Sequence, residues 1–494
     1  MPSLEELKSK WFLYSAKTPS FPPTQRHEGS SVRNWTDGNL CTFLVDGKAY
    51  MKVWHDLLAA MGRGGELYHA GWRFENVATL GAVTAPSSGA LDLVLAADKA
   101  GVSVYGMMDR SALTIVYNTP TMAWLRLHAI FTVVLDNRFP PRGSNHQKFA
   151  CMKNPASPAA VLGSIDISKT RWDDPAHASK NPDRDPRFGK ETHDTGVQIQ
   201  GPAVADVEST FRERWNDSTR TWGLEPLAPP LALISTPLSA PRAAGTHSVQ
   251  IVHTYGRTTS KFGYSWSAEG EFTGWASYLN ALKTASTYIY IEDQYFLPFD
   301  WPPCFTRTGT LAQATDIIFQ LGEAIKRGVK VAVVTPSNAE DSTHMFQKYQ
   351  RDQGAIYLQG VASAASSGGD FVIASPNNGT DWIYVHSKLL IVDDEFVLIG
   401  STNVGQRSMT FDGEMSAGII DADNKFAKAF RMELWQEHLQ AGLSGDPAAD
   451  FTTFQKSVLS KSGRLRAYDS TSTMPMGHAK AITTVIDPYG GPPR

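Results

Sequence analysis

The order of expected helices and strands runs twice along this chain of 494 residues, and this duplication strongly restricts the fold. Residues 49–74 are typical of an amphipathic helix, a glycine turn and a strand, and residues 272–296 repeat that order. Two further segments, which begin at residues 91 and 317, combine a helix that ends at glycine with a strand of alternating β-branched residues. Helices that alternate with strands indicate α/β layers, and the duplication indicates a pseudo-two-fold axis.

Each half closes with a strand and an amphipathic helix, and a proline-rich segment separates the halves. Residues 223–247 contain five prolines, which exclude a regular helix and disfavour a central strand. We therefore expect a first half at residues 1–222, a connector at 223–247 and a second half at 248–494. The expected fold class is α/β, with two similar α/β/α sandwich halves related by the pseudo-two-fold axis.

Composition narrows the class of protein. Apolar residues make up 42% of the chain and charged residues 19%, as in globular proteins. The 46 lysines and arginines against 49 acidic residues lack the basic excess of proteins that hold long nucleic acid, so no nucleic-acid partner is expected. The three cysteines lie far apart, which argues against a disulfide framework and a cysteine-based zinc site. No signal peptide or membrane-length apolar stretch is visible, so we expect a cytoplasmic protein.

One His-x-Lys tripeptide lies in each half, between the repeated elements. Residues two apart in a strand project from the same face, so each histidine and its lysine are expected to point into one cleft. One such tripeptide arises by chance, whereas two in register, each followed by Gly-Ser-x-Asn or Gly-Ser-x-Asp, indicate a functional site. The first motif contains His146, Lys148, Ser164 and Asp166, and the second contains His386, Lys388, Asp393, Ser401 and Asn403.

The second motif, a complete His-x-Lys-x4-Asp followed by Gly-Ser-x-Asn, resembles the signature of the phospholipase D superfamily. The segments HQK with GSID, TRWDD, HDTGVQIQGPAV, YIYIEDQYF and LWQEHL are similar to its phospholipid-cleaving branch, and the resemblance covers roughly residues 41–442. Asp393 is the structural aspartate of the second motif by this resemblance. Lys153 stands where the first motif should have its aspartate, a change expected to affect local packing more than chemistry.

The resemblance implies covalent catalysis without a metal or cofactor, in which one histidine attacks phosphorus and the other is the acid and base. Family precedent makes His146 the nucleophile and His386 the acid/base, an order that the symmetry of the motifs does not determine. A neutral nucleophilic imidazole needs a carboxylate on its other ring nitrogen. The repeat places Asp194 and Glu414 at equivalent positions, and the resemblance pairs Asp194 with His146 and Glu414 with His386.

The other motif residues are expected to bind or support the phosphate, through charge and hydrogen-bond donors that a metal often supplies elsewhere. A phosphate would repel Asp166 unless its carboxylate pairs with a lysine, so a supporting role is expected. Ser164 and Ser401 are candidate hydroxyl donors, with simple turn residues as an equal alternative. The full set is Lys148, Lys388, Asn403, Ser164, Ser401 and Asp166.

The implied function is a phospholipase D that converts a glycerophospholipid, such as phosphatidylcholine, to phosphatidate and free head group. Transfer of the phosphatidyl group to primary alcohols is expected as well. Two alternatives stay open: another phosphodiesterase or phosphatidyltransferase of the superfamily, including a nuclease, and a catalytically impaired lipid-binding homologue. The expected partners are a phospholipid, a membrane surface contacted peripherally, and water or a primary alcohol as acceptor. Export as an effector without a cleavable signal is compatible with the same sequence.

Overall fold

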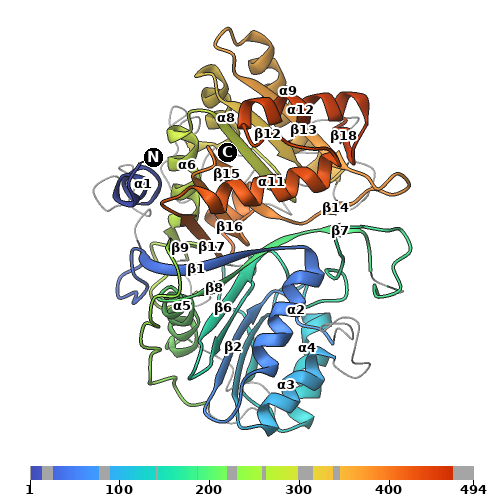
Figure 1. Cartoon of the computed structure of the whole chain (residues 1–494). Coiled ribbons are helices and arrows are strands. Elements are labelled where there is room, and N and C mark those ends of the chain that lie inside the picture. The colour runs from blue at the N-terminus through green and yellow to red at the C-terminus, as the bar shows by residue number, and fades with distance from the viewer. Residues whose placement is uncertain are drawn as a thin grey trace.

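A large mixed sheet runs through the molecule, with helices on both of its faces (Figure 1). The computed structural model describes residues 2–13, 26–76, 89–140, 143–185, 187, 189–219, 231–258, 263–298, 315–337 and 345–470. The strands of the first half are β1 (Thr36–Val45), β2 (Glu66–Gly71), β3 (Ser103–Asp109), β4 (Val133–Asp136), β5 (Phe149–Lys153), β6 (Ala159–Gly163), β7 (Thr192–His193) and β8 (Thr195–Gln200). Those of the second half are β9 (His247–Tyr255), β10 (Glu271–Phe272), β11 (Tyr288–Asp293), β12 (Lys330–Val334), β13 (Asp370–Pro376), β14 (Tyr384–Val385), β15 (Lys388–Val392), β16 (Phe396–Gly400), β17 (Glu414–Ile420) and β18 (Leu465–Ala467).

The two halves contribute the same strand order to the sheet. Outwards from the centre the order is β1-β8-β6-β5-β2-β3-β4 in the first half and β9-β17-β16-β15-β11-β12-β13 in the second. The last three strands of each row are parallel to one another, and β1 meets β9 as an antiparallel pair. The prediction of an α/β fold with two similar halves about a pseudo-two-fold axis is therefore confirmed.

Helices pack on both faces and form three apolar cores. The helices are α1 (Leu4–Trp11), α2 (Asp46–Ala59), α3 (Ala90–Lys99), α4 (Ile115–Leu127), α5 (Val204–Asn216), α6 (Thr273–Thr284), α8 (Ile317–Lys326), α9 (Met345–Ala364), α10 (Gln406–Thr410), α11 (Lys425–Leu439) and α12 (Pro447–Ser460). One core belongs to both halves and lies under α5, α11 and α12, where Trp215 of α5 and Trp435 of α11 are fully buried. The other cores lie under α2, α3 and α4 and under α6, α8 and α9.

Equivalent glycines end the equivalent helices α3 and α8, as the sequence predicted. Gly101 has φ +90° and Gly328 has φ +100°, a backbone region that glycine adopts without a Cβ clash. The N–H of Val329, one residue further on, donates to the carbonyl of Ala324 at 3.1 Å, the long-range bond that closes a helix before the chain turns into a strand. The helix-then-strand order of both halves thus depends on local sequence.

The N-terminal helix packs on the half opposite to the one predicted to contain it. Leu7 and Trp11 of α1 belong to the core under α6, and the Trp11 ring stacks on Phe396 with centroids 5.5 Å apart. Asn280 Nδ2 donates to the carbonyl of Trp11 at 2.9 Å. The prediction that residues 1–222 form the first half is therefore corrected for α1, because the apolar face of this helix is buried against the second half. The remaining division, with a connector at 223–247, stays a proposal.

Candidate active site

Both His-x-Lys motifs lie at the beginning of a strand, where segments of the two halves pair with each other. The lysine of the second motif is the first residue of β15, and that of the first motif lies directly before β5. The backbone N–H of His146 donates to the carbonyl of Gly413 at 2.7 Å, and that of His386 donates to the carbonyl of His193 at 2.8 Å. The short parallel pair of β7 and β14, visible where the halves meet in Figure 1, continues the second contact. Each motif is therefore held by the opposite half.

Each histidine takes its carboxylate partner from the opposite half. His146 Nδ1 lies 3.0 and 3.1 Å from the two carboxylate oxygens of Glu414, and His386 Nδ1 lies 2.8 Å from Asp194 Oδ2. The predicted pairing of Asp194 with His146 and of Glu414 with His386 is therefore wrong. The observed pairing follows from the backbone. The N–H of each motif histidine binds the carbonyl of the residue just before Glu414 or Asp194 in the other half, so the histidine side chain lies next to that carboxylate.

Buried serine hydroxyls hold these two carboxylates. Ser401 Oγ donates to Glu414 Oε2 at 2.5 Å, and Ser408 Oγ donates to Glu414 Oε1 at 2.6 Å. Ser164 Oγ donates to Asp194 Oδ1. The sequence predicted Ser164 and Ser401 as donors to phosphate, whereas the structure directs both hydroxyls to carboxylates. Because a hydroxyl has one proton to donate, we correct their role to that of positioning residues.

Burial and neighbouring charges favour the neutral form of both imidazoles. The pKa of His146 lies well below its usual value because of burial and then of the Lys148 and Lys388 ammonium groups. The pKa of His386 is also lowered well below its usual value, by burial and then by Arg171, Lys388 and Lys148. A neutral ring that donates its Nδ1–H to a carboxylate keeps an unprotonated Nε2, which suits a nucleophile or base. Because each lysine acts on both histidines, the motifs form one electrostatic site.

Burial also shifts the groups that surround the histidines. It raises the pKa of Glu414 to about 7 and raises the pKa of Asp194 above its usual range. It lowers the pKa of Lys388 to about 7. Lys388 Nζ donates to Gln294 Oε1 at 2.9 Å and to the carbonyl of His386 at 2.5 Å, so its ammonium group is fixed beside the histidine.

The first-motif lysine is paired with the aspartate that replaces asparagine. Lys148 Nζ lies 3.4 Å from Asp166 Oδ2 and donates to the carbonyl of His146 at 2.9 Å. The Asp166 carboxylate thus faces a lysine, the situation in which a supporting role was expected. Asn403 Nδ2 lies 3.4 Å from Ser408 Oγ, and its Oδ1 is buried without a hydrogen bond to any described residue.

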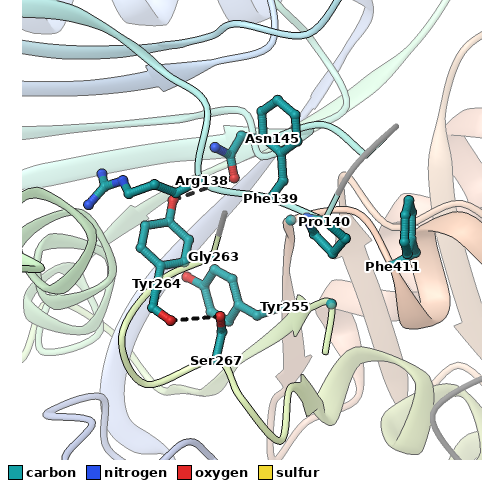
Figure 2. A pocket seen from close by; sticks show the side chains of 11 residues that line it. Arg138, Phe139, Pro140, Asn145, Tyr255, Gly263, Tyr264, Ser267 and Phe411 are labelled. Carbon is teal, nitrogen blue, oxygen red and sulfur yellow. Dashed lines mark hydrogen bonds between the residues drawn. The ribbon is translucent and has the colours of Figure 1, made fainter. Parts of the chain in front are cut away.

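A small pocket lies beside the loop that carries the first motif (Figure 2). Asn145, the residue before His146, is part of its lining, and Tyr264 forms one wall. Tyr264 Oη donates to Asp136 Oδ2 at 2.8 Å, and Ser267 Oγ donates to the Tyr264 carbonyl at 2.9 Å. Neither motif histidine is among the described lining residues, so we assign these contacts to support of the loop.

The sequence is similar to that of known lipid enzymes. Residues 278–437 match the family model described as "Cardiolipin synthase, PLD-like domain". Phospholipase D alpha 2 of Oryza sativa subsp. japonica is 26% identical over 415 aligned residues, which cover 64% of this chain and 49% of that protein. Phospholipase D gamma 3 of Arabidopsis thaliana is 25% identical over 548 residues, which cover 82% of this chain and 63% of that protein. These matches support the assignment of the chain to the phospholipase D superfamily.

The fold is also similar to that of a solved structure. The phosphatidylserine synthase of Haemophilus influenzae Rd KW20 has a TM-score of 0.55 and 12% identity, and the match covers 85% of this chain and 93% of that one. At this identity the likeness concerns the fold alone. The chain spans about half the length of the first plant relative it matches. Membership of the phospholipase D superfamily therefore accounts for the fold and the two motifs, and the substrate is a separate question.

Four residues of this phospholipase D superfamily site were not predicted from the sequence. They are Trp72, Arg171, Gln294 and Ser408. The ring of Trp72 lies 5.9 Å from that of His146. Arg171 and Gln294 lie within TRWDD and YIYIEDQYF, which were recognised as segments without a role for either residue. Ser408 lies within GSTNVGQRSMTFDGE, the continuation of the second motif, but no role was predicted for it. Trp72 carries no motif signal, because only the tertiary fold brings its ring to His146.

Lys153, which replaces the aspartate expected at the end of the first motif, forms an ion pair. Asp393 accepts hydrogen bonds from the backbone N–H groups of Ser286 and Tyr288, both at 2.9 Å, and so holds the beginning of β11. In the first half Lys153 Nζ lies 2.6 Å from an oxygen of Glu66, the first residue of the equivalent strand β2. The ion pair between Lys153 and Glu66 in the first half thus stands where Asp393 binds backbone N–H groups in the second half.

Proposed function

We propose that this protein is a phospholipase D that cleaves the head-group phosphodiester of a glycerophospholipid through a covalent phosphohistidine. One observation carries the proposal. Burial keeps both imidazoles neutral, and each ring is held through Nδ1 by a carboxylate of the other half. The charges of Lys148 and Lys388 act on both rings. The plant relatives named phospholipase D support the substrate class.

In the first step His146 Nε2 attacks phosphorus, so that a P–N bond forms and the bond from phosphorus to the head-group oxygen breaks. His386 gives its Nε2 proton to the leaving alkoxide, and the negative charge of the bound phosphodiester favours that proton. Lys148, Lys388 and Asn403 supply charge and donors to the non-bridging oxygens. The His146 side chain is 13% exposed and that of His386 is 3% exposed, which supports His146 as the nucleophile.

In the second step a water molecule or a primary alcohol gives its proton to His386 and attacks phosphorus. The P–N bond breaks, and phosphatidate or a phosphatidyl alcohol is released. His146 regains its unprotonated Nε2 and His386 is protonated again, so the site is ready for another cycle. Glu414 and Asp194 accept hydrogen bonds from the Nδ1–H groups of His146 and His386 throughout both steps. The protons therefore stay on Nδ1, and each ring stays in one tautomer.

The test supplies phosphatidylcholine vesicles together with a primary alcohol and measures choline, phosphatidate and phosphatidyl alcohol. We expect all three products, and we expect their loss in His146→Ala and in His386→Ala. His128→Ala, at an exposed histidine, is the matched control and should retain activity. Unchanged turnover in either motif variant, or choline release without phosphatidyl alcohol, would contradict the shared covalent site.

The same experiment separates the alternative functions. The family-model description and the similar solved structure each name a synthase, so glycerol and serine are included as acceptors. Cleavage of single-stranded DNA without any attack on phospholipid would identify a nuclease. Vesicle binding without turnover would identify a catalytically impaired homologue.

Exposed apolar side chains beside the site support contact with a lipid surface. Leu113 is 69% exposed, Val116 is 65% exposed and Tyr117 is 42% exposed, and we call these three residues the α4 patch. The Arg73 guanidinium lies 3.7 Å from the centre of the Tyr117 ring, and its neighbour Trp72 packs near the first-motif histidine. No helix in the described ranges is long and apolar enough to cross a bilayer. We propose that the α4 patch rests on the membrane during catalysis.

A further inference from the structure

A buried cluster of two histidines and two carboxylates lies behind Asp194, outside the proposed reaction site. Its members are Asp46 at the beginning of α2, His177, His193 in β7 and Glu437 in α11. The side chains of the first three are fully buried, and that of Glu437 is 8% exposed. Three members come from the first half of the chain and one from the second, so the cluster also joins the halves.

The facing atoms of the cluster have the spacing of a tetrahedral metal site. His177 Nε2 lies 3.1 Å from Glu437 Oε1 and 3.4 Å from Asp46 Oδ2. His193 Nδ1 lies 3.2 Å from Asp46 Oδ1 and 3.4 Å from Glu437 Oε1. Bonds of about 2.0–2.1 Å to a tetrahedral zinc ion would place the ligand atoms about 3.3–3.4 Å apart. The four contacts are close to this spacing, and one ligand atom from each of the four side chains lies within 4.8 Å of the others.

The outer ring nitrogens are already bound in the way that zinc-binding histidines require. His177 Nδ1 lies 2.8 Å from Asp173 Oδ2, and His193 Nε2 lies 3.0 Å from Glu292 Oε2. When these nitrogens donate to carboxylates, each neutral ring turns a lone pair towards the centre of the cluster. Without an ion, each ring would need a second proton to donate a hydrogen bond to the Asp46 or Glu437 carboxylate that it faces.

Two inward atoms lack a hydrogen bond. Asp46 Oδ2 and His193 Nδ1 are buried, and neither hydrogen-bonds to any residue that the structure describes. Buried polar atoms without partners are rare, and a bound ion is one established explanation for them. Both atoms belong to the set that faces the proposed zinc position.

A neighbouring group of three residues fits an ion less well. His193, Glu292 and His438 also lie together, but the two Glu292 oxygens each contact one ring nitrogen, with His438 Nε2 at 3.0 Å. Two N–H groups that donate to one carboxylate account for that geometry fully. Glu292 therefore orients His193 from outside the site.

We propose that Asp46, His177, His193 and Glu437 bind one structural Zn²⁺ ion. The ion would fix the backbone next to Asp194, the carboxylate that orients His386. The N–H of Asp194 donates to Asp46 Oδ1 at 3.1 Å, and the N–H of Asp46 donates to the carbonyl of Asp194 at 2.8 Å. A zinc ion at this point would hold α2, β7 and α11 around the partner of His386.

The first test measures metal in the full-length protein, purified without chelators or metal-affinity resin. We expect one zinc ion per chain by elemental mass spectrometry, and a lower melting temperature after treatment with a strong chelator. Protein reloaded with Co²⁺ should show the intense visible absorption of a tetrahedral site. A chain that contains no zinc and takes up none from a buffered zinc solution would overturn the proposal.

The second test locates the ion with matched variants. His177→Gln should lower zinc content at least about tenfold, and Asp173→Asn should weaken zinc affinity by about 10- to 100-fold as the loss of an outer partner. His438→Gln, in the neighbouring group, should keep its zinc. Retention of zinc by His177→Gln, or equal loss in His438→Gln, would refute this position. If His177→Gln does not fold, the wild-type zinc content and Co²⁺ spectrum still decide the matter, and neither depends on phospholipase activity.

Discussion

Replacing Glu414 by glutamine tests which histidine each carboxylate serves. Glu414 is fully buried and accepts hydrogen bonds from Ser401 and Ser408 while it contacts His146 Nδ1. An amide has the same shape but offers an N–H to Nδ1, which moves the ring proton to Nε2, the atom that attacks phosphorus in the proposed mechanism. The same carboxylate-to-amide change in a Ser-His-Asp triad costs about 10⁴ in kcat. That factor corresponds to about 5.5 kcal/mol of transition-state stabilisation, and we expect about 10³- to 10⁴-fold here.

The discriminating assay uses a phosphatidyl ester whose leaving group is p-nitrophenol in place of choline. This group departs without a proton, so the first step of the proposed mechanism no longer needs His386 as the acid, or the carboxylate partner of His386. With Glu414 on His146, the variant Glu414→Gln should lose the rapid burst of p-nitrophenol. Asp194→Asn should keep the burst and be slow only in the hydrolysis that follows.

The opposite pattern would refute the crossed pairing, because it would place Asp194 on the nucleophile. A full burst in both variants would show that neither carboxylate orients the nucleophile. Glu269→Gln is the control, since its side chain is 79% exposed and lies outside the site. Thermal melting of all three variants checks that the burst amplitudes refer to folded protein.

Three further predictions concern pH, membrane contact and stability. Glu414 must be ionised to hold the ring, and its pKa is raised to about 7, so kcat/KM should fall as pH drops below about 7. The pKa of Lys388 is lowered to about 7, so kcat/KM should also fall as the pH rises above about 7 and Lys388 loses its charge. Lys388→Arg should remove this second fall, because arginine stays charged. A kcat/KM profile that is flat across neutral pH would contradict both assignments. Paired changes Leu113→Asp and Val116→Asp should lower turnover of vesicles by about tenfold, through lost apolar contact of about 1.4 kcal/mol or more, and leave a soluble short-chain substrate unaffected; equal loss on both substrates would argue against the α4 patch. Asp393→Ala should lower the free energy of unfolding by about 1–3 kcal/mol, because backbone N–H groups of β11 lose their acceptor, as measured by urea denaturation.

Local sequence accounts for much of the architecture. Several signals affect only residues a few positions away in the sequence. They are the glycines at the ends of α3 and α8, the alternating residues of β3 and β12 and the prolines of the connector. They therefore predict the duplicated order of helices and strands. The position of α1 was not predictable in this way, since Trp11 finds its partner Phe396 across nearly the whole chain.

The sequence by itself determined the duplicated α/β order and the two His-x-Lys motifs with their lysines and candidate carboxylates. Only the tertiary structure decided that His146 pairs with Glu414, 268 positions away, and His386 with Asp194, 192 positions away. The same holds for the buried cluster around Asp46, whose members come from both halves. The physical reason is that backbone pairing across the pseudo-two-fold junction, and not distance along the chain, decides which side chains share a buried site. Burial at that junction then shifts the pKa values on which the proposed chemistry depends.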